Sequence, residues 1–384
     1  MNKLSLICQQ AHSLGNHTAR ESAVLRRVAD CQTERMGANS VECDLCGHTE
    51  IHYNSCRDRH CPLCQGSLRA QWVRSRLKEL LPVKYFHVVF TVPKELAPIA
   101  KANPRRFYSI LFQTAHQTLL QVAARKENLG ATIGGLSILH TWDQKLGFHP
   151  HIHCIIPAGG MDKPSNQWIG SSDNFFLAVR KLSVVFRGKL LSGIEQSCAK
   201  SMLAGDPSTV KHLLFEAAQK DFVVYCKPPF GGPEQVLKYL GRYTHRVGIS
   251  EQRIVNVENG IVSFSWSDRK NNNSRKILSL TLDEFVRRFL THLLPRGFRK
   301  IRYFGFMANR NRTISLKTVR DCITLSLPPV DRLLPDAATV AAAKRHTESY
   351  EVPSWKKCPA CGGQMLLRPV PLLHLVAAMT VSSG

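Results

Sequence analysis

The chain of 384 residues carries 52 Lys and Arg against 28 Asp and Glu, which gives a formal net charge of +24 and a pI near 9.8. Its hydrophobic content of 43% and charged content of 21% are ordinary for a globular protein and exclude disorder of the whole chain. No apolar run reaches the ~18 residues of a membrane span, and no secretory signal is evident, so we expect a soluble cytoplasmic protein of two or three domains. The charge excess favours nucleic acid as the partner, because no amphipathic basic helix indicates a membrane anchor.

The predicted elements mix helices and strands without strict alternation, which favours an α+β fold over a doubly wound sheet. In chain order they are a helical segment over 1–35, a helix that stops at Pro82, a strand over 85–92, an amphipathic helix over 107–122, strands over 135–142 and 151–156, a largely helical stretch over 174–214, a strand over 222–226, a helix over 233–247, and strands over 253–257 and 261–266.

Two CxxC pairs, Cys43/Cys46 and Cys61/Cys64, stand fourteen residues apart in the N-terminal part of the chain. Each pair can place two thiolates on one metal ion, so together they predict a tetrahedral structural zinc site. Cys56 and His60 lie within the same segment, and either can take part in the ligand set. A further CxxC, Cys358/Cys361, stands alone in the C-terminal tail, where it is either a metal half-site or a relic.

Three histidines, His149, His151 and His153, alternate along the segment HPHIHCII. Residues i and i+2 of a strand share a face, so His151 and His153 present a pair of imidazoles while Ile152 and Cys154 point to the core. This pattern predicts a metal-binding face, with a His-rich polar strand edge as the alternative. Candidates for a third metal ligand are His149, Asp143, Gln144 and His87.

A second candidate for chemistry is the expected helix 233–247, in which Tyr239 and Tyr243 are one turn apart. Arg242 and Arg246 share their side of the helix and suit a phosphate backbone. A metal on the paired histidines can polarise a phosphodiester that a tyrosine hydroxyl attacks, although two tyrosines at this spacing can also form a simple packing ridge. No Walker motif occurs, so no nucleotide cofactor is expected.

The segment from Phe285 to Arg320 contains no acidic residue and ten basic ones, with aromatic residues between them. Such a composition suits a groove for single-stranded nucleic acid, where cations follow the backbone and rings stack on bases. The alternative is a solvated surface over an ordinary core. The basic residues singled out here as candidate DNA contacts are Arg296, Arg299, Lys300 and Arg302.

Five segments of the chain, in order, resemble the insertion-sequence-91 family of rolling-circle transposases, which are two-tyrosine members of the HUH nuclease superfamily. These segments are NSCRDRHCPLCQG, YFHVVFTVP, LHTWDQKLGFHPHIHCIIPAGG, YLGRYTHRVGIS and RGFRKIRYFGF, and the similarity spans roughly residues 15 to 325. The resemblance implies that one DNA strand is cut to give a 5′-phosphotyrosine and a free 3′-OH. It implies His151 and His153 as ligands of Mg²⁺ or Mn²⁺, and Tyr239 and Tyr243 as nucleophiles.

The resemblance also implies an HUH-type catalytic domain with a central antiparallel sheet flanked by helices and preceded by a small zinc-ribbon-like domain. The expected division is an N-terminal helical segment (1–35), a zinc-binding finger domain (36–80), the catalytic domain (83–325) and a Pro-punctuated tail with a CxxC knuckle (326–384). A plasmid-type replication initiator is a close alternative, and a non-catalytic zinc-finger protein that binds nucleic acid is an alternative from another class.

Overall fold

The computed structural model describes residues 2–77, 79–162, 164–172, 176–230, 241, 247–268, 271–310, 312–326 and 357–369. It divides into two compact units, each built from segments that are distant in the sequence. One unit comprises residues 1–74, 245–290 and 343–384, and the other comprises residues 75–244 and 291–342. The segment 245–290, expected within the catalytic domain, therefore folds with the N-terminal part of the chain.

The first unit joins a helical pair, two small sheets and the cysteine-rich segment. Its elements are α1 (Lys3–Leu14), α2 (Ala19–Asp30), the 3₁₀ helix Glu34–Met36, β1 (Ala38–Cys43), β2 (Thr49–Tyr53), the 3₁₀ helix Glu251–Arg253, β9 (Ile254–Glu258), β10 (Ile261–Asp268), β11 (Ser274–Thr281) and β13 (Met365–Pro369). Helices α3 (Gln65–Leu77) and α9 (Leu282–Thr291) begin in this unit and end in the other. The strand orders are β13-β1-β2 and β11-β10-β9, both antiparallel.

A carboxylate holds the segment after residue 245 against the N-terminal helix. The backbone amides of Lys3 and Leu4 donate to the Glu251 carboxylate over 2.6 and 3.2 Å, and Lys3 Nζ donates to the Ile254 carbonyl over 3.1 Å. An acid at the first turn of a helix satisfies amides that have no partner within the helix. These contacts explain why residues far apart in sequence form one unit.

The second unit contains a five-stranded antiparallel sheet in the order β12-β4-β5-β3-β8. Its elements are β3 (Tyr85–Thr91), the 3₁₀ helix Lys94–Leu96, α4 (Ala97–Ala102), α5 (Pro104–Ala124), β4 (Gly134–Trp142), β5 (Phe148–Pro157), β6 (Gly159–Asp162), β7 (Gln167–Gly170), α6 (Val179–Ala199), α7 (Pro207–Ala218), β8 (Val224–Phe230), β12 (Ile301–Gly305) and α10 (Arg312–Ser326). The expected α+β class with a central antiparallel sheet is confirmed.

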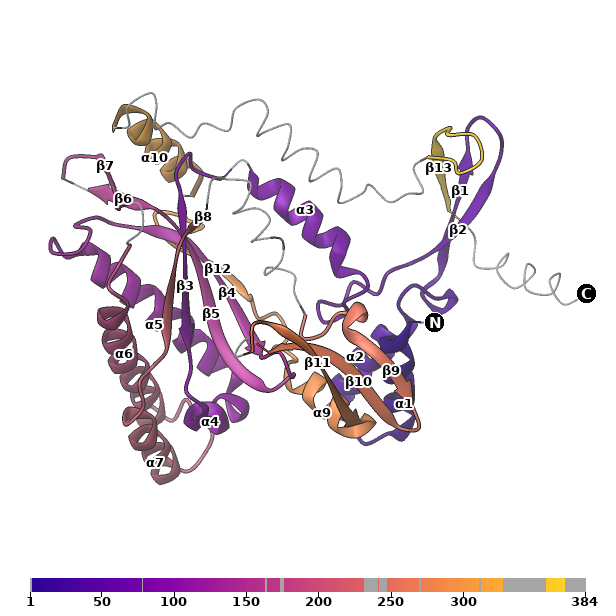
Figure 1. Ribbon diagram of the computed structural model, residues 1–384, viewed down its shortest axis with the longest axis horizontal. Helices are drawn as coiled ribbons and strands as arrows, with labels where there is room; N and C mark the ends of the chain where they lie inside the picture. The colour runs from indigo at the N-terminus through magenta and orange to yellow at the C-terminus, as the bar shows by residue number, and fades with distance from the viewer. Residues whose placement is uncertain are drawn as a thin grey trace, which may run out of the picture. The chain divides into compact units, whose positions relative to one another are not determined.

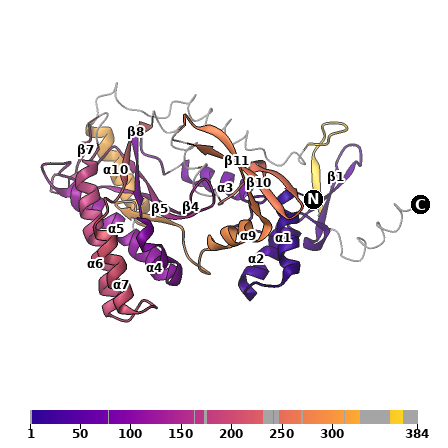
Figure 2. The same cartoon turned by 60° about the horizontal axis from the view of Figure 1, so that its bottom comes forward.

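One face of this sheet is covered by helices, with α5 and α6 running side by side (Figures 1 and 2). The buried stripe of α5, which includes Phe107, Leu111 and Leu119, packs on alternate residues of the strands, among them Phe90 and Ile152. The residues that alternate with these along each strand therefore face away from α5 and α6. Among the described residues, no helix is long and apolar enough to span a bilayer.

Candidate functional site

The face of the central sheet that points away from α5 carries histidines on three neighbouring strands. In β5, Ile152 and Cys154 are fully buried in the core, so His151 and His153 project from the other side, as their alternation predicts. The strand register places His140 of β4 directly opposite His151, and His87 of β3 lies diagonally from His153. Four imidazoles are thereby gathered on one polar patch of the sheet.

His140, His151 and His153 form a group that can hold one metal ion, since their ligand nitrogens all lie within 4.8 Å of one another. His140 and His153 are 2% and 7% exposed, while His151 is half-buried, so the group opens to solvent on the His151 side. The ring of His140 lies 4.6 Å from that of His153 and 5.5 Å from that of His151. Three imidazoles suit Mn²⁺ or Zn²⁺ better than Mg²⁺, which prefers oxygen ligands.

Hydrogen bonds fix the orientation of two of these rings. His151 Nδ1 lies 2.7 Å from the His149 carbonyl oxygen, which can only accept, so Nδ1 carries the proton and Nε2 keeps its lone pair. His153 Nδ1 lies 2.8 Å from His87 Nε2. Metal-binding histidines commonly use their second nitrogen in this way, which sets the tautomer and the direction of the lone pair.

The residues considered as a third ligand are separated by the structure. The Asp143 carboxylate accepts from the backbone amides of Lys145 and Gly147, at 2.8 and 2.7 Å, and so closes the β4–β5 turn rather than reaching a metal. A Cβ at Gly147 would lie 2.7 Å from Asp143 Oδ2, so a larger residue there would displace the carboxylate. His149 is not in the group of three, and His87 contacts His153 instead. Gln144 stays a candidate.

His140 is the member that sequence reasoning missed. It lies in the segment LHTWDQ, where one histidine in an apolar strand has no periodic partner to draw attention to it. His140 could have been found from the face of β4 on which it lies, together with the β4–β5 register, which pairs it with His151. The same face continues to the edge strand β8, where the exposed residues Tyr225 and Lys227 lie opposite Val89 and His87.

A buried histidine on the far side of the turn stabilises the hairpin that carries these ligands. His292 Nε2 donates to the Leu146 carbonyl over 3.1 Å, which leaves Nδ1 to accept from the Thr141 hydroxyl at 3.2 Å. Thr141 and Leu146 lie at opposite ends of the hairpin connection, so the imidazole bridges it. The ligand-bearing ends of β4 and β5 are held together as a result.

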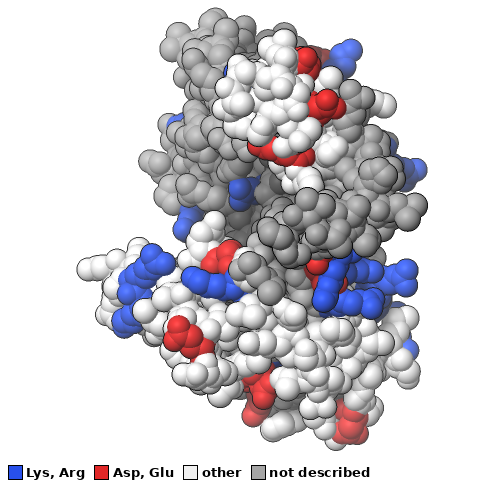
Figure 3. Space-filling view, turned by 90° about the vertical axis from the view of Figure 1, so that its right-hand side faces the viewer, with Lys and Arg blue, Asp and Glu red and all other residues white. Residues whose placement is uncertain are grey.

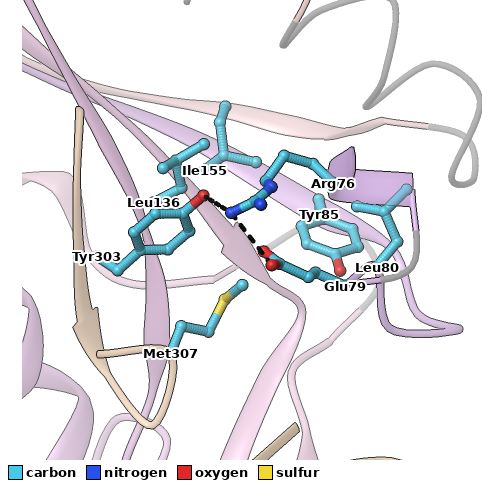
Figure 4. Close-up of a pocket in the computed structure, with 8 residues that line it drawn as sticks. All are labelled: Arg76, Glu79, Leu80, Tyr85, Leu136, Ile155, Tyr303 and Met307. Carbon is cyan, nitrogen blue, oxygen red and sulfur yellow. Dashed lines mark hydrogen bonds and ion pairs between the residues drawn. The ribbon is translucent and has the colours of Figure 1, made fainter. Parts of the chain in front are cut away.

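The same face of the central sheet holds a small pocket at the end away from the histidines (Figure 4). Arg76 donates to the Tyr303 hydroxyl over 3.2 Å, and Glu79 accepts from both Arg76 and Arg312, at 3.1 and 3.2 Å. The Arg312 guanidinium also lies 4.3 Å from the centre of the Tyr303 ring. The lining residues are Arg76, Glu79, Leu80, Tyr85, Leu136, Ile155, Tyr303 and Met307. This end of the face therefore holds paired charges, whereas the histidine end holds the group of imidazoles.

Eight of the nine cysteines of the first unit, all except Cys8, form two groups of four. Cys31, Cys56, Cys61 and Cys64 make one, and Cys43, Cys46, Cys358 and Cys361 make the other, with all ligand atoms of each group within 4.8 Å. The single site expected from Cys43, Cys46, Cys61 and Cys64 is therefore divided between two groups. His60 belongs to neither, because its Nδ1 is 2.8 Å from the Asp58 carboxylate.

The candidate DNA contacts differ in their surroundings. Arg296 and Arg299 are exposed and Lys300 is half-buried. Arg302 lies on the α5 face of the sheet, with its guanidinium 4.4 Å from the Phe112 ring and 4.9 Å from the Phe298 ring, so it points away from the histidines. Burial lowers its pKa from the ordinary value. Tyr239, Tyr243, Arg242 and Arg246 lie outside the described residues.

Comparisons with known proteins identify the class to which this fold and these metal-binding groups belong. Residues 5–92 match the family model described as "Transposase zinc-binding domain", and residues 134–313 match the one described as "Putative transposase". These two matches contain His140, His151 and His153 and six of the eight clustered cysteines, all except Cys358 and Cys361.

Individual relatives agree over most of the chain. "Putative transposase y4qJ" of Sinorhizobium fredii is 42% identical, with 91% of this chain and 90% of the relative covered. "Transposase for insertion sequence element IS801" of Pseudomonas savastanoi pv. phaseolicola is 27% identical, with 90% and 83% covered. No solved structure matches the chain. The chain belongs to the insertion-sequence-91 family of transposases.

Proposed function

We propose that this transposase cuts and rejoins a single strand of DNA through a 5′-phosphotyrosine intermediate, in a rolling-circle reaction that depends on Mg²⁺ or Mn²⁺. The observation that carries the proposal is the group His140, His151 and His153 on one face of the central antiparallel sheet. Three imidazoles with ligand nitrogens within 4.8 Å of one another have little use in packing, because the buried rings of His140 and His153 must be desolvated.

The histidines would hold the metal, which supplies positive charge to a phosphate oxygen when bound. The residues around them do the positioning. The His149 carbonyl fixes His151 so that its Nε2 faces outward, and His87 braces His153 from the neighbouring strand. His153 and His140 are buried, so their positions are set by the sheet, while the half-exposed His151 leaves an approach for the substrate.

Tyr239 or Tyr243 would supply the nucleophile. In the proposed step, the tyrosine hydroxyl oxygen attacks the phosphorus and loses its proton, the bond from phosphorus to O3′ breaks, and the leaving oxygen is protonated to a 3′-OH. The ester energy is retained in the phosphotyrosine bond, so a second 3′-OH can reverse the reaction without a nucleotide cofactor. Two tyrosines allow one to hold a cut end while the other makes the next cut.

The DNA strand would cross the open face of the sheet near the histidines. The relatives are transposases by name, and the chain's net charge of +24 favours binding to a polyanion. On the edge strand β8, the exposed Tyr225 offers a ring for stacking and the exposed Lys227 a cation for phosphate, on the same face as His87. Arg296 and Arg299 offer further exposed cations.

The test is cleavage of an end-labelled oligonucleotide that carries an end of the element, offered as a single strand or as a duplex. We expect cleavage of the single strand in Mn²⁺ or Mg²⁺ and none in EDTA, with loss of activity in His151→Ala/His153→Ala. Cys198→Ser, remote in the sequence from all these residues, serves as the matched variant that should cut normally. Metal-independent cleavage, or cleavage of the duplex alone, would contradict the proposal.

A further inference from the structure

We propose that the C-terminal Cys358 and Cys361 complete a second structural zinc site with Cys43 and Cys46, so that one metal ion clamps the C-terminal segment to the N-terminal zinc-binding domain. The family model for that domain covers residues 5–92 and so includes only half of these ligands. The proposal does not rest on the DNA chemistry proposed above, because it concerns metal content and the joining of distant segments.

The sulfur atoms are spaced as zinc requires. Cys43 Sγ lies 3.5 Å from Cys361 Sγ, and Cys46 Sγ lies 3.5 Å from Cys358 Sγ, across 318 and 312 residues of sequence. Thiolates at the ~2.3 Å zinc–sulfur distance of a regular tetrahedron stand about 3.8 Å apart, which is close to these separations. Four free thiols at this spacing, two of them exposed, gain little from packing alone.

The two CxxC turns are built alike. The Cys43 amide donates to the His48 carbonyl over 2.8 Å, and the Cys358 amide donates to the Gly363 carbonyl over 2.7 Å. Within each turn, the amide of the residue after the second cysteine donates to the carbonyl of the first, at 3.2 Å for Gly47 and 2.9 Å for Gly362. Both glycines have positive φ, +71° and +75°. Each turn thus presents two thiols to a common point.

Backbone and apolar contacts join the two turns into one module. Strand β13 pairs with β1 along five residues, and the two strands lie side by side in Figure 1. Asp44 exchanges hydrogen bonds with Gln364, at 3.0 Å through its amide and 2.9 Å through its carboxylate. Val41 and Met365 are buried together with Cys43 and Cys358. A hydrophobic core this small does not stabilise a fold by itself, and a structural metal ion is one of the common ways in which small domains gain stability.

The N-terminal part of this module is acidic, and its C-terminal part is basic. Residues 38–53, which hold β1, β2 and the first turn, contain Glu42, Asp44 and Glu50 and no Lys or Arg, whereas residues 357–369 contain Lys357 and Arg368 and no acid. The upper part of Figure 3 shows acidic side chains among uncharged ones, with a basic side chain beside them. In a chain with a charge of +24, the acidic side chains of residues 38–53 are poorly suited to a DNA backbone, which favours a structural role for this part of the module.

The first cysteine group shares no residue with the second, so the two predict two zinc ions per chain. In the first group Cys56 Sγ lies 3.8 Å from Cys64 Sγ, again the edge of a zinc tetrahedron. Zinc content of the purified full-length protein, measured by elemental mass spectrometry, tests this directly. The histidine group can also hold zinc, so the measurement is made in His140→Ala/His151→Ala/His153→Ala. In that background we expect two ions, one when Cys358→Ser/Cys361→Ser is added, and two when Cys198→Ser/Cys322→Ser is added. A single ion in the histidine variant alone, or two after Cys358→Ser/Cys361→Ser is added, would overturn the proposal.

Alkylation of the native protein separates a shared site from local misfolding. In Cys43→Ser, we expect Cys358 and Cys361 to become reactive toward iodoacetamide, because their metal is lost, while Cys31, Cys56, Cys61 and Cys64 stay protected by theirs. Peptide mass spectrometry reads each thiol separately. Equal labelling of Cys358 and Cys361 in the unaltered protein and in Cys43→Ser would show that the chain ends share no metal.

Discussion

His87 Nε2 lies 2.8 Å from His153 Nδ1, and the two imidazole rings stack with their centres 5.1 Å apart. Burial, together with the nearby charge of Lys227, lowers the pKa of His87 to about 3, so this ring is neutral at physiological pH. A neutral imidazole has one donor and one acceptor nitrogen. If His153 offers Nε2 to a metal, its Nδ1–H donates to His87, which makes His87 a positioning residue rather than a ligand.

The role of His87 gives the first prediction. His87→Leu removes the acceptor, so we expect the Mn²⁺ concentration needed for half-maximal cleavage to rise about 10- to 100-fold, in line with other partners of metal-binding histidines. His87→Gln keeps an acceptor of similar reach and should recover most of the loss. Metal titration of single-strand cleavage, with circular dichroism as the control for folding, measures both. Equal behaviour of the two variants would mean that His87 only fills space.

His140 gives the second prediction, since it completes the group with His151 and His153. We expect His140→Ala to lower cleavage at a fixed Mn²⁺ concentration by about 100-fold, because one of three ligands is lost. The matched variant is His149→Ala, which removes a neighbouring imidazole outside the group while keeping the carbonyl that binds His151. Electron paramagnetic resonance measures Mn²⁺ binding in the same two variants, and we expect weaker binding in His140→Ala than in His149→Ala. A larger defect in His149→Ala than in His140→Ala would reverse the ligand assignment.

Two arginines only three residues apart give the third prediction. Arg299 is exposed, whereas Arg302 packs on Phe112 and Phe298 and faces α5. We expect Arg299→Gln to weaken single-stranded DNA binding and to reduce its salt dependence by about one phosphate contact. Arg302→Gln should leave the salt dependence unchanged and lower the free energy of unfolding by about 1 kcal/mol, through lost ring contacts. Fluorescence anisotropy at several salt concentrations and chemical denaturation give the two readouts, and an exchange of the two phenotypes would refute the placement of Arg302.

The fourth prediction concerns the stability of the second unit in acid. His116 stacks on Phe304 and contacts Ser137 Oγ at 2.6 Å, and burial, with help from Arg302, lowers the pKa of His116 to about 3. Between that pH and the ordinary value near 6.5, the unfolded chain binds a proton that the folded chain does not, so stability falls as the pH decreases.

The measurement is urea denaturation of the unaltered protein and of His116→Gln at pH 7 and pH 5. The unaltered protein should lose more free energy of unfolding between these values, by up to about 1.4 kcal/mol per pH unit below 6.5. His87 shares the same trend and keeps part of the dependence in both proteins. An identical change in the two proteins would show that His116 titrates normally in the folded state.

The sequence predicts those strands in which polar and apolar residues alternate, or in which all residues are apolar. The segment 85–92 reads as a strand because it is apolar and β-branched, and β3 occupies 85–91. In β5, the alternation of His151 and His153 with Ile152 and Cys154 also gives the correct facing of each side chain. By contrast, β11 has an exposed and largely polar sequence, and neither periodicity nor burial marks it out.

The pairing of the metal ligands lies beyond local sequence. A CxxC turn shows that two thiols share a metal, but not which other turn they meet. Cys31 stands 25 residues before Cys56, and neither belongs to a CxxC motif, while Cys358 is 312 residues from Cys46. His140 likewise joins His151 only through the register of β4 and β5. For Cys358 and for His140, long-range strand pairing rather than the motif brings the residues together.

The most direct measurement of the proposed chemistry is the site of covalent attachment between protein and DNA. After incubation with a single-stranded element end and Mn²⁺, protease digestion and mass spectrometry should find a nucleotide-modified peptide that contains Tyr239 and Tyr243, joined through a 5′-phosphate. Tyr239→Phe/Tyr243→Phe and His140→Ala should both lose this adduct. An adduct on another residue, or one that persists in the double tyrosine variant, would contradict the proposed mechanism.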